Sequence, residues 1–399
     1  MSYVKQDRLW WWLSRSLHRL TSSDTHRESP HDAADSPLDS ELELALLQRK
    51  LMWRREGDPS GRFLNVFMDQ NNMCNLKCRM CGFSDARVQG LPRYHMPREL
   101  FDSIADQLFP HTAYLQLSIL TEPFMTPDFP DRLQRVRELG VPYSHVITNG
   151  TLLSESVIGK VLDAGISRLT FSIDGGTREG YEEIRVGAKF QNVIRNVRLF
   201  KRMRDARGSA IPQLRINHVL TKWNIDRFDE FLALIEDIRP EAVDVRTVEP
   251  MTFTSGEESA DPLFFERVRK VRAKFRDFCK QTGIEDSGFI RDRETPIDLL
   301  TDAGRPVNCR RPWDTLAIHA NGDVQPCMSW TRPPYGNLSQ QSFEEIWRGS
   351  KLEALRREFD NTAPGVDCQH CSIKKRDSAE PYDDFFFKMI SKSLPPRVF

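Results

Sequence analysis

The sequence predicts an α/β protein built on a parallel sheet, and two observations support this fold class. Between residues 62 and 280, six short runs rich in β-branched and aromatic residues alternate with helical stretches. Strands separated by helices need crossover connections, which place the strands parallel and the helices on the faces of the sheet. The chain has 399 residues, enough for one large hydrophobic core. The alternation alone leaves open a doubly wound sheet or a partial barrel.

The expected elements follow one another in regular order. The strands are expected at residues 63–68, 114–118, 143–148, 168–173, 213–220 and 243–248. The helices between them are expected at residues 99–108, 129–139, 155–164, 193–207 and 227–238. A further helix is expected to carry Phe275, Phe278 and Cys279.

The composition excludes several classes of function. The 57 Lys and Arg residues balance 57 Asp and Glu residues, so the formal net charge is zero. Binding to nucleic acid is therefore not expected, because it needs an excess of cations. A hydrophobic fraction of 39% with 29% charged residues is typical of a soluble protein, and no apolar run approaches the ~20 residues of a membrane span. The apolar run at residues 9–13 lacks a cleavage site, so a cytoplasmic location is expected.

Changes in composition and hydrophobic pattern along the chain predict four segments. Residues 1–57 contain an amphipathic helix, a linker and a second helix; residues 58–290 form the α/β domain; residues 291–380 form a small loop-rich domain; residues 381–399 form an aromatic tail. The first helix carries Trp10, Trp11 and Trp12 among basic residues. This pattern suits either peripheral contact with the inner face of a membrane or packing on the protein itself.

The first group of cysteines predicts a metal cluster. Cys74, Cys78 and Cys81 form a C-x₃-C-x₂-C run directly after the first strand. Clustered cysteines in a reducing compartment indicate metal binding or catalysis. A structural zinc site uses four protein ligands, whereas three thiolates leave one position of a [4Fe–4S] cluster open. We therefore expect a [4Fe–4S] cluster with one open iron.

The remaining cysteines form a second group and one isolated residue. Cys309, Cys327, Cys368 and Cys371 follow a C-x₁₇-C-x₄₀-C-x₂-C spacing. Four thiolates complete either a zinc site or a fully ligated [4Fe–4S] cluster, and the spacing does not separate the two. Cys279 stands alone and is expected to be a core thiol, with a hydrogen-atom donor to a substrate radical as the alternative.

The run Cys74-Asn-Leu-Lys-Cys78-Arg-Met-Cys81 resembles the motif of the radical S-adenosylmethionine (SAM) superfamily. In that superfamily an open iron binds SAM, and one electron from the cluster cleaves SAM to a 5′-deoxyadenosyl radical that takes a hydrogen atom from the substrate. The resemblance implies a partial (β/α)₆ radical SAM barrel over the α/β domain. It also implies that Cys74, Cys78 and Cys81 bind the cluster and that Met80 contacts the cofactor.

Three later motifs resemble the SAM-binding segments of the superfamily. Thr121-Glu122-Pro123 stands where the superfamily has Gly-Gly-Glu-Pro, with Leu120-Thr121 in place of the glycines. Thr148-Asn149-Gly150 and Ser172-Ile173-Asp174-Gly175 match the segments that contact the ribose and methionine of SAM. Arg185 resembles an arginine that pairs with the SAM carboxylate, since a planar fork suits a carboxylate. The implied SAM contacts are Thr121, Glu122, Asn149, Ser172, Asp174 and Arg185.

The surroundings of the second cysteine group are similar to the SPASM/twitch domain. The segments that carry this similarity are Cys309-Arg-Arg-Pro-Trp313, His319-Ala-Asn-Gly322, Tyr335-Gly-Asn337-Leu338 and Glu345-Ile-Trp347. That domain carries auxiliary iron–sulfur clusters behind a radical SAM barrel. No cysteine follows Cys371, so the single-cluster form is expected. The resemblance implies an auxiliary [4Fe–4S] cluster on Cys309, Cys327, Cys368 and Cys371.

The expected function is the oxidation of a hydroxylated metabolite such as a sugar, an aminocyclitol or a lipid-linked glycan, with the auxiliary cluster as electron acceptor. Glu249 or His218 is the expected base for the hydroxyl proton, and Asn217 and Arg246 are expected to face the substrate. A flavodoxin- or ferredoxin-type protein is expected to supply electrons. The alternatives are a redox-neutral epimerase that uses Cys279, a maturase of ribosomal peptides or protein side chains, and a zinc-stabilised binding protein.

Overall fold

The computed structural model describes residues 62–247, 262–287, 311–328 and 333–360. The chain divides into two units, residues 1–61 and residues 62–399, and every described residue belongs to the second. Several expected features therefore lie outside the described residues: the two N-terminal helices, the aromatic tail, Glu249, Cys309, Cys368 and Cys371.

A single mixed sheet organises the described part of the chain. Its strands are β1 (Leu64–Met68), β2 (Thr112–Gln116), β3 (Tyr143–Thr148), β4 (Arg168–Ser172), β5 (Gln213–Leu220), β6 (Ala242–Thr247), β7 (Glu285–Asp286), β8 (Thr315–Ile318), β9 (Asp323–Gln325) and β10 (Gly336–Asn337). They are ordered β10-β9-β8-β1-β2-β3-β4-β5-β6-β7. Strands β1 to β7 pair in parallel in chain order. The parallel sheet expected from the alternating pattern is confirmed.

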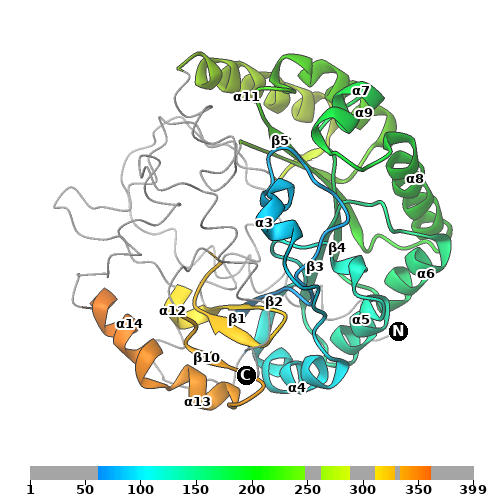
Figure 1. Ribbon diagram of the computed structural model, residues 1–399. Helices are drawn as coiled ribbons and strands as arrows, with labels where there is room; N and C mark the ends of the chain where they lie inside the picture. The colour runs from blue at the N-terminus through cyan, green and yellow to red at the C-terminus, as the bar shows by residue number, and fades with distance from the viewer. Residues whose placement is uncertain (1–61, 248–261, 288–310, 329–332, 361–399) are drawn as a thin grey trace, which may run out of the picture. The chain divides into compact units, whose positions relative to one another are not determined.

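Helices connect successive strands and cover one face of the sheet (Figure 1). The α-helices are α3 (Ala86–Gln89), α4 (Arg98–Leu108), α5 (Phe129–Glu138), α6 (Glu155–Ala164), α7 (Arg178–Ile184), α8 (Phe190–Ala206), α9 (Phe228–Ile238), α11 (Pro262–Thr282), α12 (Arg311–Asp314), α13 (Phe343–Trp347) and α14 (Ser350–Asp360). Short 3-10 helices occur at Gly82–Ser84, Phe109–His111, Pro123–Met125 and Ile225–Arg227. The curved sheet with helices α4 to α9 outside it forms a partial, unclosed barrel.

The hydrophobic core lies between the outer face of the sheet and the helices. In β4 and β5, Leu169, Phe171 and Ile216 are fully buried on this face. The ring of Phe171 packs against Phe200 of α8, with 5.9 Å between ring centroids. Because side chains alternate along a strand, the neighbouring residues of β4 and β5 point to the inner, concave face of the barrel. That inner face carries most of the polar side chains of these strands.

Two features of the fold were not expected. The first is α7, a short helix between β4 and α8 that ends beside Arg185. The second is the parallel pairing of β8 with β1, from Asn65 opposite Thr315 to Met68 opposite Ile318. The beginning of the C-terminal region therefore extends the same sheet instead of standing apart from it.

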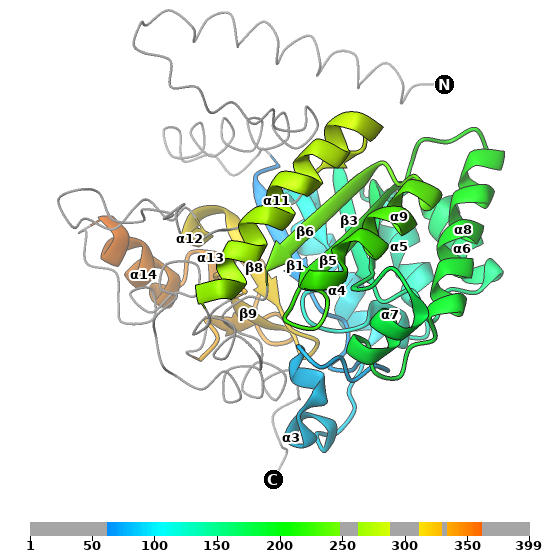
Figure 2. The ribbon, with the colours of Figure 1, turned by 90° about the horizontal axis from the view of Figure 1, so that it is seen from above.

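Helix α11 packs on α9 and β7 at the far edge of the sheet (Figure 2). Its buried side chains Phe264, Val268, Phe275 and Cys279 recur at helical spacing and form one apolar stripe. The ring of Phe275 meets Phe228 of α9 edge to face at 6.2 Å. The expected helix around Cys279 is confirmed.

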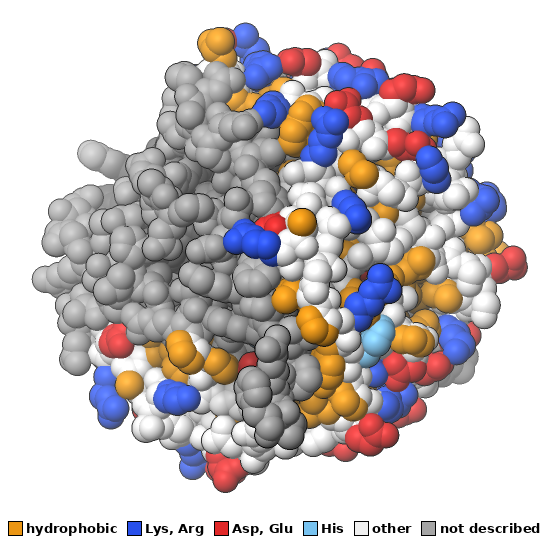
Figure 3. Space-filling view, viewed as in Figure 1, with side chains coloured by type: hydrophobic (Ala, Val, Ile, Leu, Met, Phe, Trp, Pro, Cys, Tyr) orange, Lys and Arg blue, Asp and Glu red, His pale blue; other side chains and the backbone are white. Residues whose placement is uncertain are grey.

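The exposed surface mixes charges of both signs. On the face shown in Figure 3, acidic and basic side chains alternate around the described part of the molecule. This distribution agrees with the formal net charge of zero. Among the described residues, no helix has the length and apolar character required to cross a membrane.

Candidate functional site

The loop that carries Cys74, Cys78 and Cys81 follows β1 at the carboxyl end of the sheet. Its backbone is bonded to the end of α7 and the turn that follows. The amide of Arg79 donates to the carbonyl of Ile184 and the amide of Lys77 donates to that of Val186, both at 2.9 Å. The amide of Cys81 donates to the carbonyl of Cys78 at 2.9 Å and closes a turn. This turn and the two fastening bonds hold the three cysteines in one short loop.

The three thiols lie close enough to affect one another's ionisation. Cys74 and Cys81 are partly buried and pack against the same apolar cluster of Phe83 and Val88. Burial raises the pKa of all three thiols, that of Cys78 to about 12, and the neighbouring thiols raise the pKa values of Cys74 and Cys78 further. Deprotonating three such thiols together requires a strongly positive group between them.

A cubane cluster fits this arrangement of thiols. The described residues contain no group of three His, Cys, Asp or Glu side chains that converge on a single metal ion. In a [4Fe–4S] cluster each thiolate binds its own iron, so the sulfurs need not meet at one point.

Glu122 joins the cysteine loop to the ends of β2 and β3. One carboxylate oxygen accepts from the hydroxyl of Thr148 at 2.7 Å, and the other accepts from the amide of Asn149 at 2.7 Å. Its own amide donates to the carbonyl of Met73 at 2.9 Å. Burial raises the pKa of Glu122 to about 7, although these hydrogen bonds oppose the change.

Asn149 continues the same network toward the first cysteine. Its side-chain amide donates to Oδ1 of Asn75 at 2.9 Å and reaches Sγ of Cys74 at 3.8 Å. Its oxygen accepts from the amide and the hydroxyl of Thr151, at 2.9 and 2.6 Å. The structure thus brings Asn149, Glu122 and Cys74 together, as the sequence predicts.

Asp174 and Arg185 form a buried ion pair beside the loop. Nε of Arg185 donates to Asp174 at 2.6 Å, and the other oxygen of Asp174 accepts from the amide of Val219 at 2.8 Å. Burial opposes the charge of Arg185, but Asp174 and the thiol of Cys78 outweigh it and raise the pKa of the guanidinium. The terminal nitrogens of Arg185 have no partner among the described residues, so they can bind a carboxylate.

Thr121 stays a predicted cofactor contact, and its side chain bonds within the protein. Its hydroxyl donates to Oδ1 of Asp69 at 2.8 Å, and Asp69 also accepts from the amide of Ile119 at 2.8 Å. The carboxylate of Asp69 therefore occupies the side chain of Thr121 and holds the turn that replaces the two glycines. The structure assigns the Thr121 side chain a role in holding this turn.

Met80 and Ser172 occupy different environments. Met80 is buried within the cysteine loop. Ser172 ends β4 on the inner face and pairs in register with Asn217 of β5. Its hydroxyl has no hydrogen-bond partner among the described residues.

His218 does not face the interior of the barrel, contrary to the expectation of a substrate base. It lies on the outer face of β5, 1% exposed, with its ring stacked on Phe231 of α9 at 4.0 Å. Nδ1 is hydrogen-bonded to the carbonyl of Ile173 at 2.9 Å. Burial lowers the pKa of His218 to about 4 and makes it a poor base at neutral pH.

Cys279 also lies away from the inner face. It belongs to the apolar stripe of α11, and burial raises the pKa of its thiol to about 12. This position favours the prediction that Cys279 is a core thiol. It does not support the alternative, a hydrogen-atom donor to a substrate in the barrel.

The structure reveals a polar network on the inner face that the sequence reading missed in part. Asp244 of β6 is fully buried and binds Arg215 of β5, and it accepts from Nε of Arg246 at 2.6 Å. His145 of β3 is hydrogen-bonded to Tyr114 and Thr170. Burial lowers the pKa of His145 well below its usual value, and Arg215, Arg168 and Arg246 lower it further. The sequence signal for this network is the presence of charged residues at alternate positions of otherwise apolar strands.

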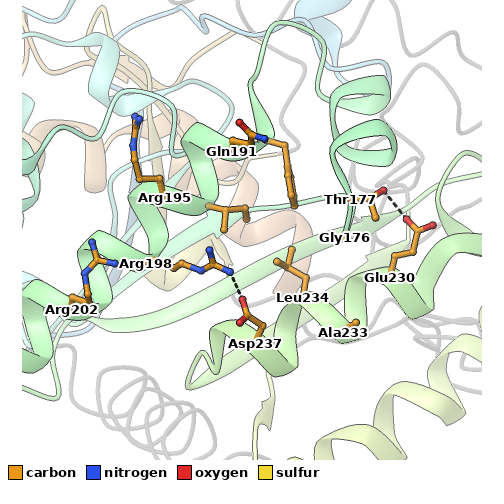
Figure 4. Close-up of a pocket in the computed structure, with 12 residues that line it drawn as sticks. Gly176, Thr177, Gln191, Arg195, Arg198, Arg202, Glu230, Ala233, Leu234 and Asp237 are labelled. Atoms are coloured by element: carbon orange, nitrogen blue, oxygen red, sulfur yellow. Dashed lines mark hydrogen bonds and ion pairs between the residues drawn. The ribbon is translucent and has the colours of Figure 1, made fainter.

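A cavity of about 700 Å³ opens on the outer layer of helices (Figure 4). It lies between α8 and α9, with Ala233 and Leu234 in its wall and Arg195, Arg198 and Arg202 along α8. None of the expected site residues lines it. The cavity is therefore separate from the site at the carboxyl end of the sheet.

The comparison with protein-family models agrees with this geometry, an unclosed barrel with three cysteines after β1. The radical SAM superfamily model matches residues 71–235, and the model of the SPASM domain, an iron–sulfur cluster-binding domain, matches residues 309–372. The chain belongs to the radical SAM superfamily and carries a C-terminal SPASM domain. Its cofactors are SAM and two [4Fe–4S] clusters.

Curated relatives of this chain carry out different reactions. An AdoMet-dependent heme synthase of Oleidesulfovibrio alaskensis is 25% identical over 79% of this chain and 81% of its own length. A GTP 3′,8-cyclase of Limosilactobacillus fermentum is 26% identical over 64% of this chain and 76% of its own length. A PqqA peptide cyclase of Gluconobacter oxydans is 27% identical over 64% of this chain and 68% of its own length.

Solved structures share the fold at low identity. Streptococcus suis SuiB bound to its precursor peptide SuiA superposes with a TM-score of 0.59 at 15% identity, over 88% of this chain and 79% of SuiB. The protein anSMEcpe with bound AdoMet and Cp18Cys peptide gives a TM-score of 0.54 at 16% identity, over 83% of this chain and 96% of that protein. These likenesses support the unclosed barrel.

Proposed function

We propose that this radical SAM enzyme oxidises a hydroxylated metabolite, such as a sugar, an aminocyclitol or a lipid-linked glycan, by two electrons. When bound, SAM and its cluster supply a 5′-deoxyadenosyl radical that takes a hydrogen atom from a carbon of the substrate, and the auxiliary cluster takes up the second electron. The hydroxyl proton leaves to a base, for which Glu249 stays the expected residue.

The observation that carries the proposal is the polar inner face of the barrel. Ser172, Asn217 and Asp244 stand in register on three neighbouring strands, next to the arginines of β5 and β6. Hydroxyl, amide and carboxylate groups recognise hydroxyl groups through hydrogen bonds. An apolar substrate would leave these groups unpaired, at a cost of about 1–3 kcal/mol for each buried group.

The residues at the carboxyl end of the sheet take the following roles in this proposal. Cys74, Cys78 and Cys81 bind the SAM cluster, and Cys309, Cys327, Cys368 and Cys371 bind the auxiliary cluster. Glu122 and Asn149 hold the cysteine loop against the ends of β2 and β3. The free terminal nitrogens of Arg185 receive the carboxylate of SAM, while Asp174 fixes the guanidinium plane. Four protein ligands leave the auxiliary cluster without an open iron, which suits electron transfer. The lack of a cysteine after Cys371 supports the single-cluster, twitch-like form.

A substrate screen and one pair of variants test the proposal. Anaerobic enzyme with SAM and reductant is incubated with candidate sugars, aminocyclitols and lipid-linked glycans, and 5′-deoxyadenosine released with substrate is measured. With the substrate found, Cys368→Ala is expected to keep SAM cleavage and lose the oxidised product. Cys279→Ala is the matched control and is expected to keep both. An unchanged product yield in Cys368→Ala would refute the acceptor role.

A metal count accompanies this experiment. Anaerobically purified enzyme is expected to hold about eight irons per chain, as two cubane clusters require. The variant Cys368→Ala is expected to lose about four of them. Zinc in place of iron at either site would contradict the proposal.

Modification of a peptide or protein side chain is the second candidate. The relative named PqqA peptide cyclase and the likeness to SuiB favour it. The same screen tests this candidate. Release of 5′-deoxyadenosine with peptides, and none with sugars or cyclitols, would favour peptide modification. A redox-neutral epimerase is disfavoured by the position of Cys279 on the outer layer.

The partners remain predictions. A flavodoxin- or ferredoxin-type donor is proposed to reduce the SAM cluster, and the protein is proposed to be cytoplasmic. Peripheral membrane contact would depend on the first helix. Flotation of liposomes with the full chain and with a chain lacking residues 1–21 tests this contact, and equal flotation would exclude it.

A further inference from the structure

The side chain of Asn149 uses its full hydrogen-bonding capacity within the protein. Its Oδ1 accepts from the amide and the hydroxyl of Thr151, at 2.9 and 2.6 Å. Its Nδ2 donates to Oδ1 of Asn75 at 2.9 Å and to Sγ of Cys74 at 3.8 Å, a longer distance that suits sulfur, a large and weak acceptor. A side-chain amide has two lone pairs and two hydrogens, so these four contacts account for all of them.

Thr151 and Asn75 fix which way this amide points. The backbone N–H of Thr151 can only donate, so the atom that faces it is the oxygen of Asn149, and the NH₂ group then faces Cys74. Nδ2 of Asn75 donates to the hydroxyl of Thr151 at 2.8 Å, which leaves Oδ1 of Asn75 to accept from Asn149. Reversing the amide of Asn149 would place oxygen against oxygen at Asn75. One hydrogen of Asn149 is therefore committed to the sulfur of Cys74.

The main chain of Asn149 is held as firmly as its side chain. Its amide donates to Glu122 at 2.7 Å, and the amide of Gly150 donates to the hydroxyl of Thr148 at 3.0 Å. Gly150 has φ +75°, and a Cβ added there would lie 2.8 Å from the ring of Phe171. The turn therefore requires glycine after Asn149. The hydrogen-bond donor is thus preorganised by the chain itself.

The acceptor of this bond, Cys74, is a predicted ligand of the SAM-binding cluster. Backbone amides act on the same group of thiols: burial raises the pKa values of Cys74 and Cys81, whereas the amides of Leu76 and Phe83 lower them. The bond from Asn149 differs in that it comes from a side chain, so a substitution removes it. A hydrogen bond to an ionised acceptor is stronger than one to a neutral acceptor, so this bond gains strength when Cys74 is a thiolate. Hydrogen bonds to the sulfurs are among the factors that set the reduction potential of a [4Fe–4S] cluster.

We propose that Asn149 is a positioning residue that acts through Cys74: its N–H···S hydrogen bond stabilises the reduced state of the SAM-binding cluster and raises the reduction potential. Reduction adds one electron, and part of the added negative charge falls on the ligand sulfurs, where the positive end of the N–H dipole is aimed. The electron comes from the proposed flavodoxin- or ferredoxin-type donor, and no bond of the protein is made or broken. The inference goes beyond the proposed function, because it concerns the reduction that precedes any substrate chemistry.

Redox titration of the anaerobically purified enzyme, followed by electron paramagnetic resonance, tests the proposal without a substrate. The SAM-binding cluster is identified as the one whose signal changes when SAM is added, and its midpoint potential is then measured without SAM. Asn149→Leu keeps a side chain of similar size and removes the donor. We expect its equilibrium constant for reduction to fall about tenfold, which is a shift of about 59 mV to more negative potential. Asn75→Ala is the matched control: it removes the other partner of the same NH₂ group, keeps the bond to Cys74 and is expected to keep the wild-type potential.

A second variant separates this effect on the potential from a merely structural role. Asn149→Asp has nearly the same shape and keeps the oxygen that accepts from Thr151, but a carboxylate oxygen replaces the donor. If Asn149 only held the turn, Asn149→Asp would have a potential closer to that of the wild type than Asn149→Leu has. We expect the opposite order at pH 8, because a negative charge beside Cys74 disfavours reduction further.

The iron content of each variant completes the test and is expected to equal that of the wild type. The proposal is overturned if both Asn149 variants keep the wild-type potential, or if Asn75→Ala shifts it as far as Asn149→Leu does. It is also overturned if both Asn149 variants lose the irons of this cluster, since Asn149 would then hold the cluster in place. Failure of the substrate screen would refute the proposed oxidation and leave this result untouched, because the titration uses no substrate.

Discussion

The carboxyl end of the sheet and the inner face of the barrel differ in how their polar side chains are paired. At the carboxyl end, Glu122 and Asn149 bond to residues of the protein itself, and each of their side-chain oxygens has a partner. On the inner face, one side-chain oxygen each of Asn217 and Asp244 is buried and has no hydrogen-bond partner among the described residues. The chain itself satisfies the polar groups of the first region, whereas two polar atoms of the second stay unpaired among the described residues.

The largest expected effect is at the cysteine loop. Cys74→Ala removes one proposed cluster ligand and is expected to abolish 5′-deoxyadenosine formation, because the cluster cannot be held by two thiolates. The measurement is chromatography of 5′-deoxyadenosine after anaerobic incubation with SAM and dithionite. Cys279→Ala serves as the control with normal cleavage. Cleavage retained in Cys74→Ala would remove the loop from the catalytic machinery.

The second-largest expected effect is a loss of folding stability on substitution in the turn after β4. A Cβ added to Gly176 would overlap the backbone of Glu230 and Phe231 in α9, and neither backbone can move alone. Gly176→Ala is expected to destabilise the fold by about 3 kcal/mol or more, as an overpacked site does. Gly159→Ala in α6 is the matched control, since its added Cβ meets nothing within 4 Å. The control is expected to gain about 0.5–1 kcal/mol.

Thermal midpoints of the anaerobically purified variants provide the measurement. A drop of several degrees for Gly176→Ala, with no drop for Gly159→Ala, is the expected result. Equal midpoints would mean that the turn and α9 are not packed as closely as the structure places them.

Arg185 tests whether the carboxyl end binds an anion through geometry or through charge alone. Arg185→Lys keeps the positive charge and loses the planar fork that Asp174 orients. We expect the Kd for SAM to rise about 30-fold, in the range for a lost charge-assisted hydrogen bond. The exposed Arg195→Lys is the control and is expected to change nothing. Unchanged SAM affinity in Arg185→Lys would place the SAM carboxylate elsewhere.

Much of this architecture could be predicted from the sequence. The expected strands at residues 143–148 and 213–220 coincide with β3 and β5, because apolar runs and flanking turns mark them clearly. The resemblance to the radical SAM superfamily implied that the cysteine loop, Glu122 and Asn149 serve one cofactor, and the structure places them side by side at the carboxyl end of the sheet. The pairing of β8 with β1 was not predictable, since it joins segments about 250 residues apart.

The inner face was harder to predict, for a physical reason. In the run Gln213–Leu220 every second residue points inward, but the sequence does not say which set does so when both contain polar residues. His218 was assigned to the inner face together with its neighbour Asn217, although alternation allows only one of them there. Arg215 and Asp244 went unnoticed because no motif contains them.

The smallest expected effect separates the two faces of β5 directly. His218 also has a buried unpaired nitrogen, Nε2, but it lies among the rings of Phe228 and Phe231 on the outer face. Burial lowers the pKa of His218 from 6.5 to about 4, so its neutral form is favoured in the folded protein. The unfolded chain then binds more protons below pH 6.5, and stability falls as the pH falls toward 4. Between pH 8 and pH 5.5 this loss is about 1.4 kcal/mol.

His218→Phe removes the titrating group and keeps an aromatic ring against Phe231. The variant is expected to lose about 1.4 kcal/mol less stability than the wild type between pH 8 and pH 5.5. It is expected to keep its SAM cleavage, because the side chain lies on the outer face of β5. Denaturant midpoints at the two pH values provide the measurement. A variant with the pH slope of the wild type would show that His218 titrates as it does in the unfolded chain, and lost SAM cleavage would show that its side chain acts on the inner face. Either result would contradict the placement of His218 on the outer face of β5.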